Sequence, residues 1–386
     1  MTRLGPGGEA SAVAGSPRWE GHELAYGVDV GGTKILGVAI DAGGEVRSQR
    51  RVPTPRQAAG SAARGQRDGP GGQAARSGGS ETSGSHPGEA VADAIAALLG
   101  ELHRDVSGRA RDDASVPALA SSPIGIGIAG LVETGGVLRF APNLAGASGA
   151  DIGALVMSRL CDEAGRNSIC AKNDANCTAF AELVLGAARG MRYGIVVTLG
   201  TGVGGALIVD GRVETGARGF AGEVGHMVVD PNGPACPCGK RGCWERYASG
   251  AGLARLAREA ALAGTLHEAV RLAGGNPELV TGEHVTAAAA GGDTEALHVI
   301  DELGWWVGLG LANLVALLDP ERIVVGGGLG HAGEMLLEPS RSALAALVEG
   351  GAARGTVPVV EAALGEQAGA VGAALAARTG AMDPVV

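Results

Sequence analysis

The sequence contains the same pattern twice: two runs of β-forming residues joined by a short glycine-rich turn. The first copy spans residues 26–40 around Gly-Gly-Thr-Lys, and the second spans residues 194–209 around Leu-Gly-Thr-Gly-Val-Gly-Gly. Each copy predicts a β-hairpin. Because strand and helix patterns follow both copies, the repeat predicts two α/β halves, each offering a glycine turn to a shared interdomain cleft.

The remaining periodic segments extend this plan. Apolar residues at helical spacing predict a helix from about residue 89 to 103, and a run of alternating Ile and Gly predicts a buried strand at 124–129. A second round predicts a strand at 169–171 and a helix at 176–188. Later elements are a buried helix within 303–318, which falls short of the roughly 20 apolar residues of a spanning helix, a strand at 322–325 and a closing helix near 366–378.

Two segments differ in composition from the rest. Residues 56–88 contain no Val, Ile, Leu, Met, Cys or aromatic residue, so they offer nothing to offset the entropy of ordering, and we expect a disordered insertion. Residues 1–23 are similarly rich in Gly, Pro and Ser, and we expect a disordered tail. The first lobe is then expected at 24–142 and the second at 143–362.

Charge and cysteine usage bound the partners and the compartment. The net charge of −10 argues against nucleic acid and anionic membranes as partners, because both require clustered positive charge. Residues 1–23 lack the apolar segment of a secretory signal. Six cysteines, three of them within residues 236–243, indicate metal chemistry in a reducing compartment rather than a disulfide framework. We expect a cytoplasmic protein.

The two glycine turns are candidate phosphate-binding sites, because glycine lets backbone N–H groups approach phosphate oxygens closely. A plain hairpin turn would explain either one alone, but two in one chain favour a nucleotide. Asp29, beside the first turn, is placed to organise Mg²⁺ through water. Three glycines after the strand at 322–325 offer a flat surface for a nucleoside, which is a weak signal alone. The candidate residues are Gly31, Gly32, Thr33 and Lys34 in the first turn, Gly200, Thr201, Gly202 and Gly204 in the second, and Gly326, Gly327 and Gly328 in the third.

The strongest local signal is a set of three thiols and one imidazole: Cys236, Cys238, Cys243 and His226. The residues between the cysteines are loop formers, which disfavours the alternative of free cysteines in a core. Four such ligands close a tetrahedral zinc site, so the metal is expected to be structural. Cys161, Cys170 and Cys177 lack this spacing and are expected to be ordinary buried thiols.

Three acidic residues lie where chemistry is expected. Glu223 and Glu245 flank the zinc ligands. The cysteine loop at 236–243, here called the zinc knuckle, would therefore fix both carboxylates as acceptors for hydroxyl groups. The alternative is that both are solvated surface glutamates. Asp174 lies between a strand end and a helix start. We interpret Asn176 as the helix N-cap, which leaves Asp174 to act as a general base; a capping role for Asp174 is the alternative.

Taken together, these motifs resemble the ROK family, named for repressors, open-reading-frame proteins and kinases. The resemblance runs from about residue 26 to the C-terminus. Its motifs are Asp-Val-Gly-Gly-Thr-Lys at 29–34, Pro-Asn-Leu at 142–144, Asn-Asp-Ala-Asn at 173–176, Leu-Gly-Thr-Gly at 199–202, Gly-Glu-Val-Gly-His at 222–226 and Cys-x-Cys-Gly-x-x-Gly-Cys at 236–243.

The resemblance implies a fold and a set of roles. The implied fold is α/β, the two-lobed actin-like (ribonuclease H-like) ATPase fold, with a C-terminal helix at 363–380 that returns to the first lobe. Asp174 is implied to be the general base, and both glycine turns are implied to bind ATP phosphates. The implied sugar contacts are Asn143, Asn173, Glu223, His226 and Glu245, with His226 also serving the zinc.

The expected function is ATP-dependent phosphorylation of a hexose at its 6-hydroxyl, with glucose the leading candidate and Mg²⁺ and structural zinc as cofactors. Kinases for N-acetylhexosamines, mannose or fructose remain open as alternatives. So does a sugar-responsive transcriptional regulator, although residues 1–23 are short and rich in Gly and Pro for a helix-turn-helix. The resemblance also suggests a homodimer or homotetramer.

Overall fold

The computed structural model describes residues 24–55, 87–109, 118–144, 146–160, 169–329, 333–380 and 382. The tail predicted at 1–23 and the insertion predicted at 56–88 therefore lie outside the described residues, except for Pro87 and Gly88. Those two residues begin helix α1, Pro87–Arg109, so the helix starts before the predicted residue 89.

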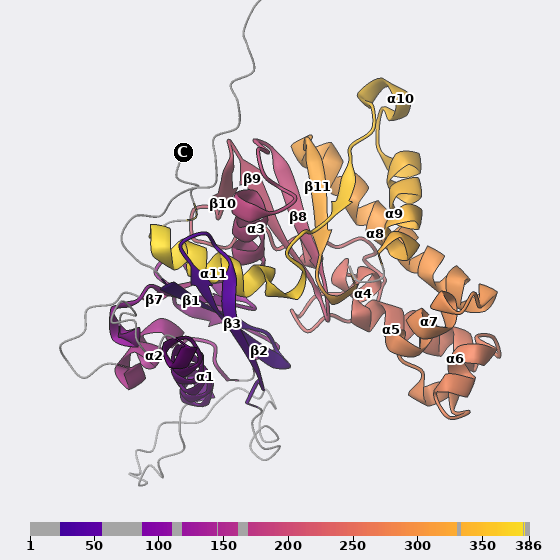
Figure 1. Cartoon of the computed structure of the whole chain (residues 1–386). Helices are drawn as coiled ribbons and strands as arrows, with labels where there is room; N and C mark the ends of the chain where they lie inside the picture. The colour runs from indigo at the N-terminus through magenta and orange to yellow at the C-terminus, as the bar shows by residue number, and fades with distance from the viewer. Residues whose placement is uncertain are drawn as a thin grey trace, which may run out of the picture.

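Two five-stranded sheets form the framework of the protein (Figure 1). In each sheet a central strand pairs antiparallel with its hairpin partner on one side and parallel with a later strand on the other. The first sheet has the order β3-β2-β1-β4-β7 and the second has β10-β9-β8-β11-β12. The strands are β1 Leu24–Val30, β2 Lys34–Asp41, β3 Val46–Pro53, β4 Ile124–Ile128 and β7 Ile169–Asn173, then β8 Gly194–Leu199, β9 Val203–Val209, β10 Arg212–Glu214, β11 Arg322–Gly326 and β12 Val359–Glu361.

The matching strand orders confirm the repeated α/β architecture and the two-lobed fold. One boundary differs from the sequence interpretation. The sequence places the start of the second lobe at residue 143, whereas β7 pairs in parallel with β4 and so belongs to the first sheet. The hydrogen-bonded sheets therefore divide after Asn173. A small ribbon of β5, Leu131–Val132, and β6, Leu138–Phe140, extends the first lobe.

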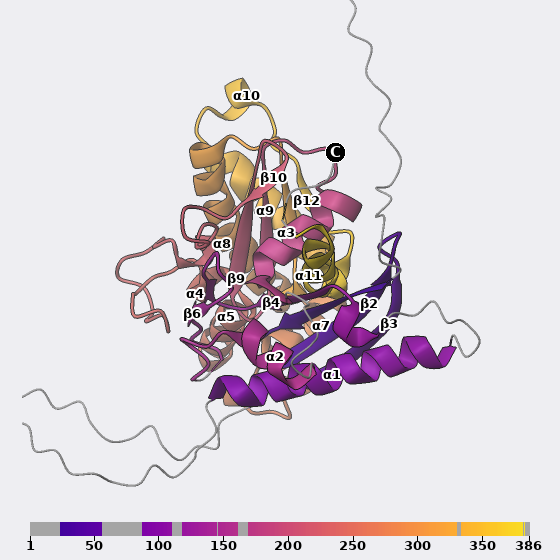
Figure 2. The same ribbon diagram turned by 90° about the vertical axis from the view of Figure 1, so that its left-hand side faces the viewer.

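Helices cover the outer faces of both sheets. The first sheet is covered by α1 and by α2, Ile152–Leu160, and α1 runs along the outside of the indigo strands in Figure 2. The apolar residues that repeat at helical spacing along α1 are all buried: Val91, Ile95, Leu98, Leu99 and Leu102. On the second sheet, β8 and β11 share a core with α8, Thr294–Leu318, and α9, Glu334–Leu347. The remaining helices extend this layer away from the sheet: α4 Glu245–Ala248, α5 Gly250–Leu262, α6 His267–Leu272 and α7 Gly282–Ala290 pack on α8, and α10 Gly351–Arg354 packs on α9.

Helix α8 is longer than the sequence suggests. The predicted buried segment at 303–318 is the second part of a helix of 25 residues that starts at Thr294. Within the described part of the chain it passes the length and composition criteria for a membrane-spanning helix, but 61% of the apolar window is buried inside the protein. That burial is what a core helix shows.

Two helices lie between the sheets: α3, Asp174–Leu185, and α11, Ala368–Thr379. They share a third core with residues from both sheets. Glycines on the strands allow α11 to approach closely, because a Cβ at Gly27 would lie 1.9 Å from the carbonyl oxygen of Ala370 and one at Gly125 would lie 1.8 Å from that of Ala373. The closing helix therefore returns to the first sheet, as the resemblance implies.

Candidate active site

The first functional element is the junction between β7 and α3. Here the structure corrects the sequence interpretation: Asn173, not Asn176, is the N-cap, and its Oδ1 accepts a hydrogen bond of 3.0 Å from the backbone N–H of Asn176. The Asn173 amide also donates to the carbonyl of Gly130 at 3.0 Å. Asp174 is the first residue of the helix, and its Oδ1 accepts from the N–H of Ala175 at 2.9 Å.

A row of four carboxylates extends from the first lobe to the second through this junction. Asp29 on β1 and Glu223 of the second lobe both interact electrostatically with Asp174, and Glu223 also interacts with Glu245. Burial raises the pKa of Asp174. Burial and then the charge of Asp174 raise the pKa of Asp29 to about 7, against the lowering effect of Lys34. Burial and then the charges of Asp174 and Glu245 raise the pKa of Glu223 to about 7. Such perturbed carboxylates are typical of catalytic sites.

The first glycine turn lies at the carboxyl end of β1. It closes on itself through a hydrogen bond of 3.0 Å from the N–H of Gly31 to the carbonyl of Lys34. A Cβ at Gly32 would lie 2.9 Å from the Cβ of Asn143, so the predicted sugar contact Asn143 packs against this turn. Thr33 is exposed, and the Lys34 ammonium lies 3.4 Å from the carboxylate of Glu366.

The second glycine turn lies at the carboxyl end of β8. The N–H of Gly200 donates to the carbonyl of Gly202 at 2.9 Å, and Thr201 between them is exposed. A Cβ at Gly202 would lie 2.2 Å from Oε2 of Glu245, so any larger residue here would displace that carboxylate from its position. A Cβ at Gly204 would similarly lie 2.5 Å from the Thr198 hydroxyl.

The third glycine turn follows β11 and lies beside the second. Gly327 has a positive φ of 89°, and a Cβ there would lie 2.5 Å from the carbonyl oxygen of Leu199. A Cβ at Gly326 would lie 2.9 Å from that of Ala362, whereas one at Gly328 would meet nothing within 4 Å. The structure therefore brings the second and third turns together at one sheet edge, where ligands of open α/β sheets bind.

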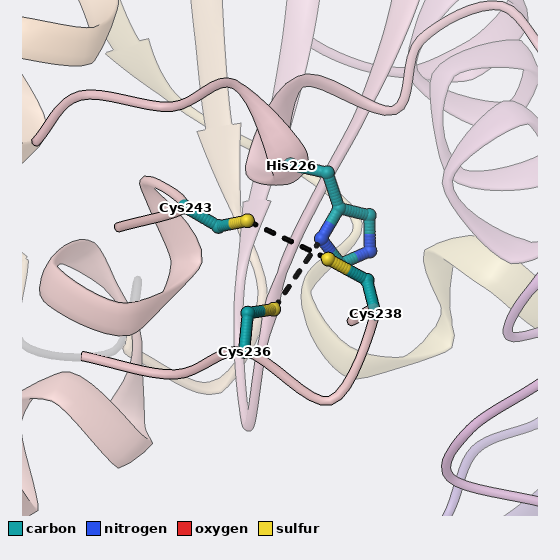
Figure 3. Close-up of side chains that lie close together, drawn as sticks. All are labelled: His226, Cys236, Cys238 and Cys243. Carbon is teal, nitrogen blue, oxygen red and sulfur yellow. Dashed lines mark hydrogen bonds between the residues drawn. The ribbon is translucent and has the colours of Figure 1, made fainter. Parts of the chain in front are cut away.

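The predicted metal ligands converge (Figure 3). One donor atom from each of His226, Cys236, Cys238 and Cys243 lies within 4.8 Å of all the others. The Cys238 and Cys243 sulfurs are 3.6 Å apart, and Nδ1 of His226 is 3.8 Å from the Cys236 sulfur. Ligands at zinc–sulfur bond lengths on a tetrahedron are about 3.8 Å apart, so the donor set fits Zn²⁺.

The His226 ring links this cluster to the carboxylate row. Its Nδ1 faces the thiols, while its Nε2 lies 4.0 Å from Oε2 of Glu223. Glu245 makes a second link, since its Oε1 lies 3.7 Å from the Cys236 sulfur and its Oε2 lies 3.4 Å from the N–H of Val203. The knuckle therefore holds both glutamates near the second turn. Of the other cysteines, Cys177 is buried and Cys170 half-buried, and Cys161 lies outside the described residues.

Several contacts of the site were missed from the sequence. Trp244 follows the last zinc ligand, is fully buried and donates from Nε1 to the carbonyl of Trp306 at 2.7 Å, which anchors the knuckle on α8. Its position beside Cys243 was the available signal. Gly369 packs against Asp29, because a Cβ there would lie 2.9 Å from the Asp29 Cγ. No local signal marks that contact, since 340 positions of chain separate the partners.

Two cavities lie away from this site. One of about 510 Å³ is lined by residues of α9, α10 and the segment before β12, and one of about 330 Å³ lies beside β7 and α2. Neither is lined by any of the four carboxylates. The chemistry described above therefore depends on the row between the lobes and on the glycine turns.

Comparisons with known proteins agree with this geometry. A model of the ROK family matches residues 79–379. A glucokinase of Streptomyces coelicolor is 35% identical over 366 residues, which are 94% of this chain and 99% of that protein. A crystal structure of a ROK family glucokinase from Streptomyces griseus, in complex with glucose and AMPPNP, is 35% identical with a TM-score of 0.74, and the match covers 92% of this chain and 99% of that one.

The matches also include a regulator. A xylose repressor of Bacillus spizizenii is 30% identical over 225 residues, which are 58% of this chain and 53% of the repressor. The shared region is thus only about half of the repressor, whereas the match to the Streptomyces glucokinases extends over nearly their whole length.

Proposed function

Because this chain belongs to the ROK family, we propose that it is a sugar kinase that transfers the γ-phosphoryl group of ATP to the 6-hydroxyl of glucose. The observation that carries the proposal is the 35% identity, over 92% of the chain, to a kinase structure that holds glucose and AMPPNP. The glycine turns, which offer backbone N–H groups to phosphate oxygens, and the carboxylate row, which offers a proton acceptor, support this proposal.

Asp174 is proposed as the general base. It accepts the proton of the sugar 6-hydroxyl while that oxygen forms a bond to the γ-phosphorus, and the bond from the γ-phosphorus to the bridging oxygen of ADP breaks. Burial raises the pKa of Asp174, which makes its carboxylate a stronger base than an exposed aspartate. The hydrogen bond from the N–H of Ala175 fixes one of its oxygens and leaves the other for the substrate.

The sugar contacts are proposed to come from both lobes. Asn143 offers an amide from the first lobe, and Glu223 and Glu245 offer carboxylates from the second. With Nδ1 of His226 on the metal, its Nε2 would carry the proton and donate to a sugar hydroxyl or to Glu223. Asn173 has a smaller share in recognition than the resemblance implies, because its amide already caps α3 and bonds to Gly130.

The cofactors follow from the same residues. Zn²⁺ would be held by His226 and the three knuckle thiolates, and its role is to hold Glu223 and Glu245 in place. Mg²⁺, which neutralises phosphate charge when bound with ATP, prefers oxygen ligands such as the carboxylate of Asp29. The three glycine turns would contact the nucleotide.

We further propose a cytoplasmic location and a dimeric or tetrameric state, with neither nucleic acid nor membrane as a partner. The net charge of −10 supports the absence of polyanionic partners. Reduced thiols at the knuckle support a reducing compartment.

The test is an assay of the purified, zinc-loaded protein with ATP and Mg²⁺ against glucose, mannose, fructose, N-acetylglucosamine and N-acetylmannosamine. We expect kcat/KM to be largest with glucose. NMR of the reaction mixture should identify the product as glucose 6-phosphate. A larger value with another sugar would reassign the substrate. Sugar binding by calorimetry without any ADP formation would instead favour the regulator.

A further inference from the structure

A fully buried carboxylate that the proposed reaction does not use lies near the end of helix α3. Glu182 has no exposed surface, and it accepts three hydrogen bonds from backbone N–H groups. Its Oε2 accepts from Ala187 at 2.7 Å and from Ala363 at 3.0 Å, and its Oε1 accepts from Leu364 at 2.9 Å. Burying a charge is costly unless such donors compensate it, so these three bonds account for its presence in the interior.

The three donors belong to the two segments in which the chain passes between the sheets. Ala187 follows α3 on the way from β7 in the first sheet to β8 in the second. Ala363 and Leu364 follow β12 on the way back to α11, and the preceding residue, Ala362, still donates to Val325 of the second sheet at 2.8 Å. The Glu182 side chain therefore binds both crossings.

The first crossing is held from its other side as well. The guanidinium of Arg322, the first residue of β11, donates to the carbonyl of Ala187 at 2.7 Å. The backbone N–H of Ala187 is thus bound to Glu182 of α3, and its carbonyl is bound to Arg322 of the second sheet. A rotation of one lobe against the other must be absorbed by the dihedral angles of these short crossings, and their attachment to Glu182 limits it.

The hydrogen bonds that Glu182 accepts from residues 187, 363 and 364 are here called the Glu182 clamp. Helix α3 carries both Glu182 and the proposed base, Asp174. Glu182 follows Asp174 by eight residues on the same helix, which corresponds to about 12 Å along its axis. From this geometry we propose that Glu182 is a positioning residue for phosphoryl transfer. By binding both crossings it holds α3, and with it Asp174, in a fixed relation to the glycine turns of both lobes. The catalytic part of this inference rests on the proposed function.

The test is Glu182→Gln, which replaces one of the two acceptor oxygens by an NH₂ group and so leaves at least one of the three N–H groups without its partner. A misplacement of about 1 Å can lower turnover about 100-fold, so we expect kcat to fall by about 10- to 100-fold. The Kd values for glucose and AMPPNP, measured by calorimetry, should change by less than about threefold. Amide hydrogen exchange should accelerate at residues 187, 363 and 364.

The matched control is Asp293→Asn, which also replaces a carboxylate that accepts a hydrogen bond from a backbone N–H. Asp293 caps α8 within the second lobe, where its Oδ1 accepts from the N–H of Ala296 at 2.8 Å. The kcat of this variant should stay within about twofold of wild type. Should Glu182→Gln not fold, Glu182→Asp keeps the charge on a shorter side chain that cannot reach both crossings, and the same results are expected.

A folded Glu182 variant with wild-type kcat, or equal losses of kcat in the Glu182 and Asp293 variants, would overturn the proposal. So would a loss of ligand affinity as large as the loss of kcat. If the wild-type protein does not phosphorylate glucose, the proposed function fails, and unchanged exchange at residues 187, 363 and 364 in the variant would separately refute the clamp.

Discussion

Replacing Asp174 by Asn tests the centre of the proposed mechanism. The variant keeps the size of the side chain and an oxygen to accept from the N–H of Ala175, but it cannot take a proton. General-base catalysis contributes about 10²- to 10⁴-fold, so kcat should fall by that factor, which corresponds to about 2.7–5.5 kcal/mol of activation free energy.

The same substitution should change stability little. Loss of a negative charge in the first turn of α3 costs about 0.3–1 kcal/mol. It also removes the repulsion that helps to raise the pKa of Asp29 and of Glu223, and the two effects oppose each other. The free energy of unfolding, measured by urea titration, should therefore stay close to that of the wild type while turnover collapses.

The assay combines turnover, affinity and pH. Steady-state ADP release gives kcat, calorimetry gives the Kd of glucose and of AMPPNP, and metal analysis verifies the zinc. In the wild type, kcat/KM should rise with pH as Asp174 loses its proton. Because burial raises the pKa of Asp174, this rise should occur at a pH above the ordinary aspartate value of about 4. The rise should be absent from the Asp174→Asn variant. As a comparison, Glu223→Gln should chiefly raise the KM for glucose. Near-normal turnover in folded, zinc-loaded Asp174→Asn protein would show that another group takes the proton.

Three further predictions concern the metal, a close contact and a half-buried histidine. Cys238→Ser should lose the single zinc expected per chain and lower the Tm, as metal analysis and calorimetry would show; unchanged zinc content would contradict the site. Gly369→Ala places a methyl group 2.9 Å from the Asp29 Cγ, so it should raise the Mg²⁺ concentration needed for half-maximal kcat, and an unaltered Mg²⁺ titration would argue against a role for Asp29. Burial lowers the pKa of His103, whose Nδ1 lies 2.8 Å from the Tyr26 hydroxyl. The unfolded chain therefore takes up this proton first as the pH falls, and the free energy of unfolding should decrease below about pH 6.5. Urea titrations at pH 7.5 and 5.5 should show a smaller decrease for His103→Gln than for wild type, and equal decreases would exclude His103 as the cause.

The parts of the fold that the sequence predicts well depend on nearby residues. The hairpins follow from strand runs around glycine turns, and the zinc cluster follows from four ligands within residues 226–243, so local spacing is sufficient for both. The N-cap was assigned to the wrong asparagine because Asn173 and Asn176 are both good caps, and only the backbone path at the end of β7 distinguishes them.

Other features depend on residues far apart in the chain. The membership of β7 in the first sheet is set by its pairing with β4, and the fit of α11 is set by glycines on β1 and β4. The clamp at Glu182 joins it to residues 181 and 182 positions later. The sequence shows a glutamate among apolar residues in the second half of α3, but neither its burial nor its partners can be read from it.

The return of α11 to the first sheet has a consequence for how the protein is made. The surface around Gly27 and Gly125 stays uncovered until residues near Ala370 and Ala373 arrive, about 340 residues after Gly27 leaves the ribosome. At about 5–20 residues per second, the earliest strands wait roughly 20–70 s for the helix that covers them. During that interval their apolar face is open to chaperones and to other nascent chains, and a message truncated before α11 would leave it open permanently.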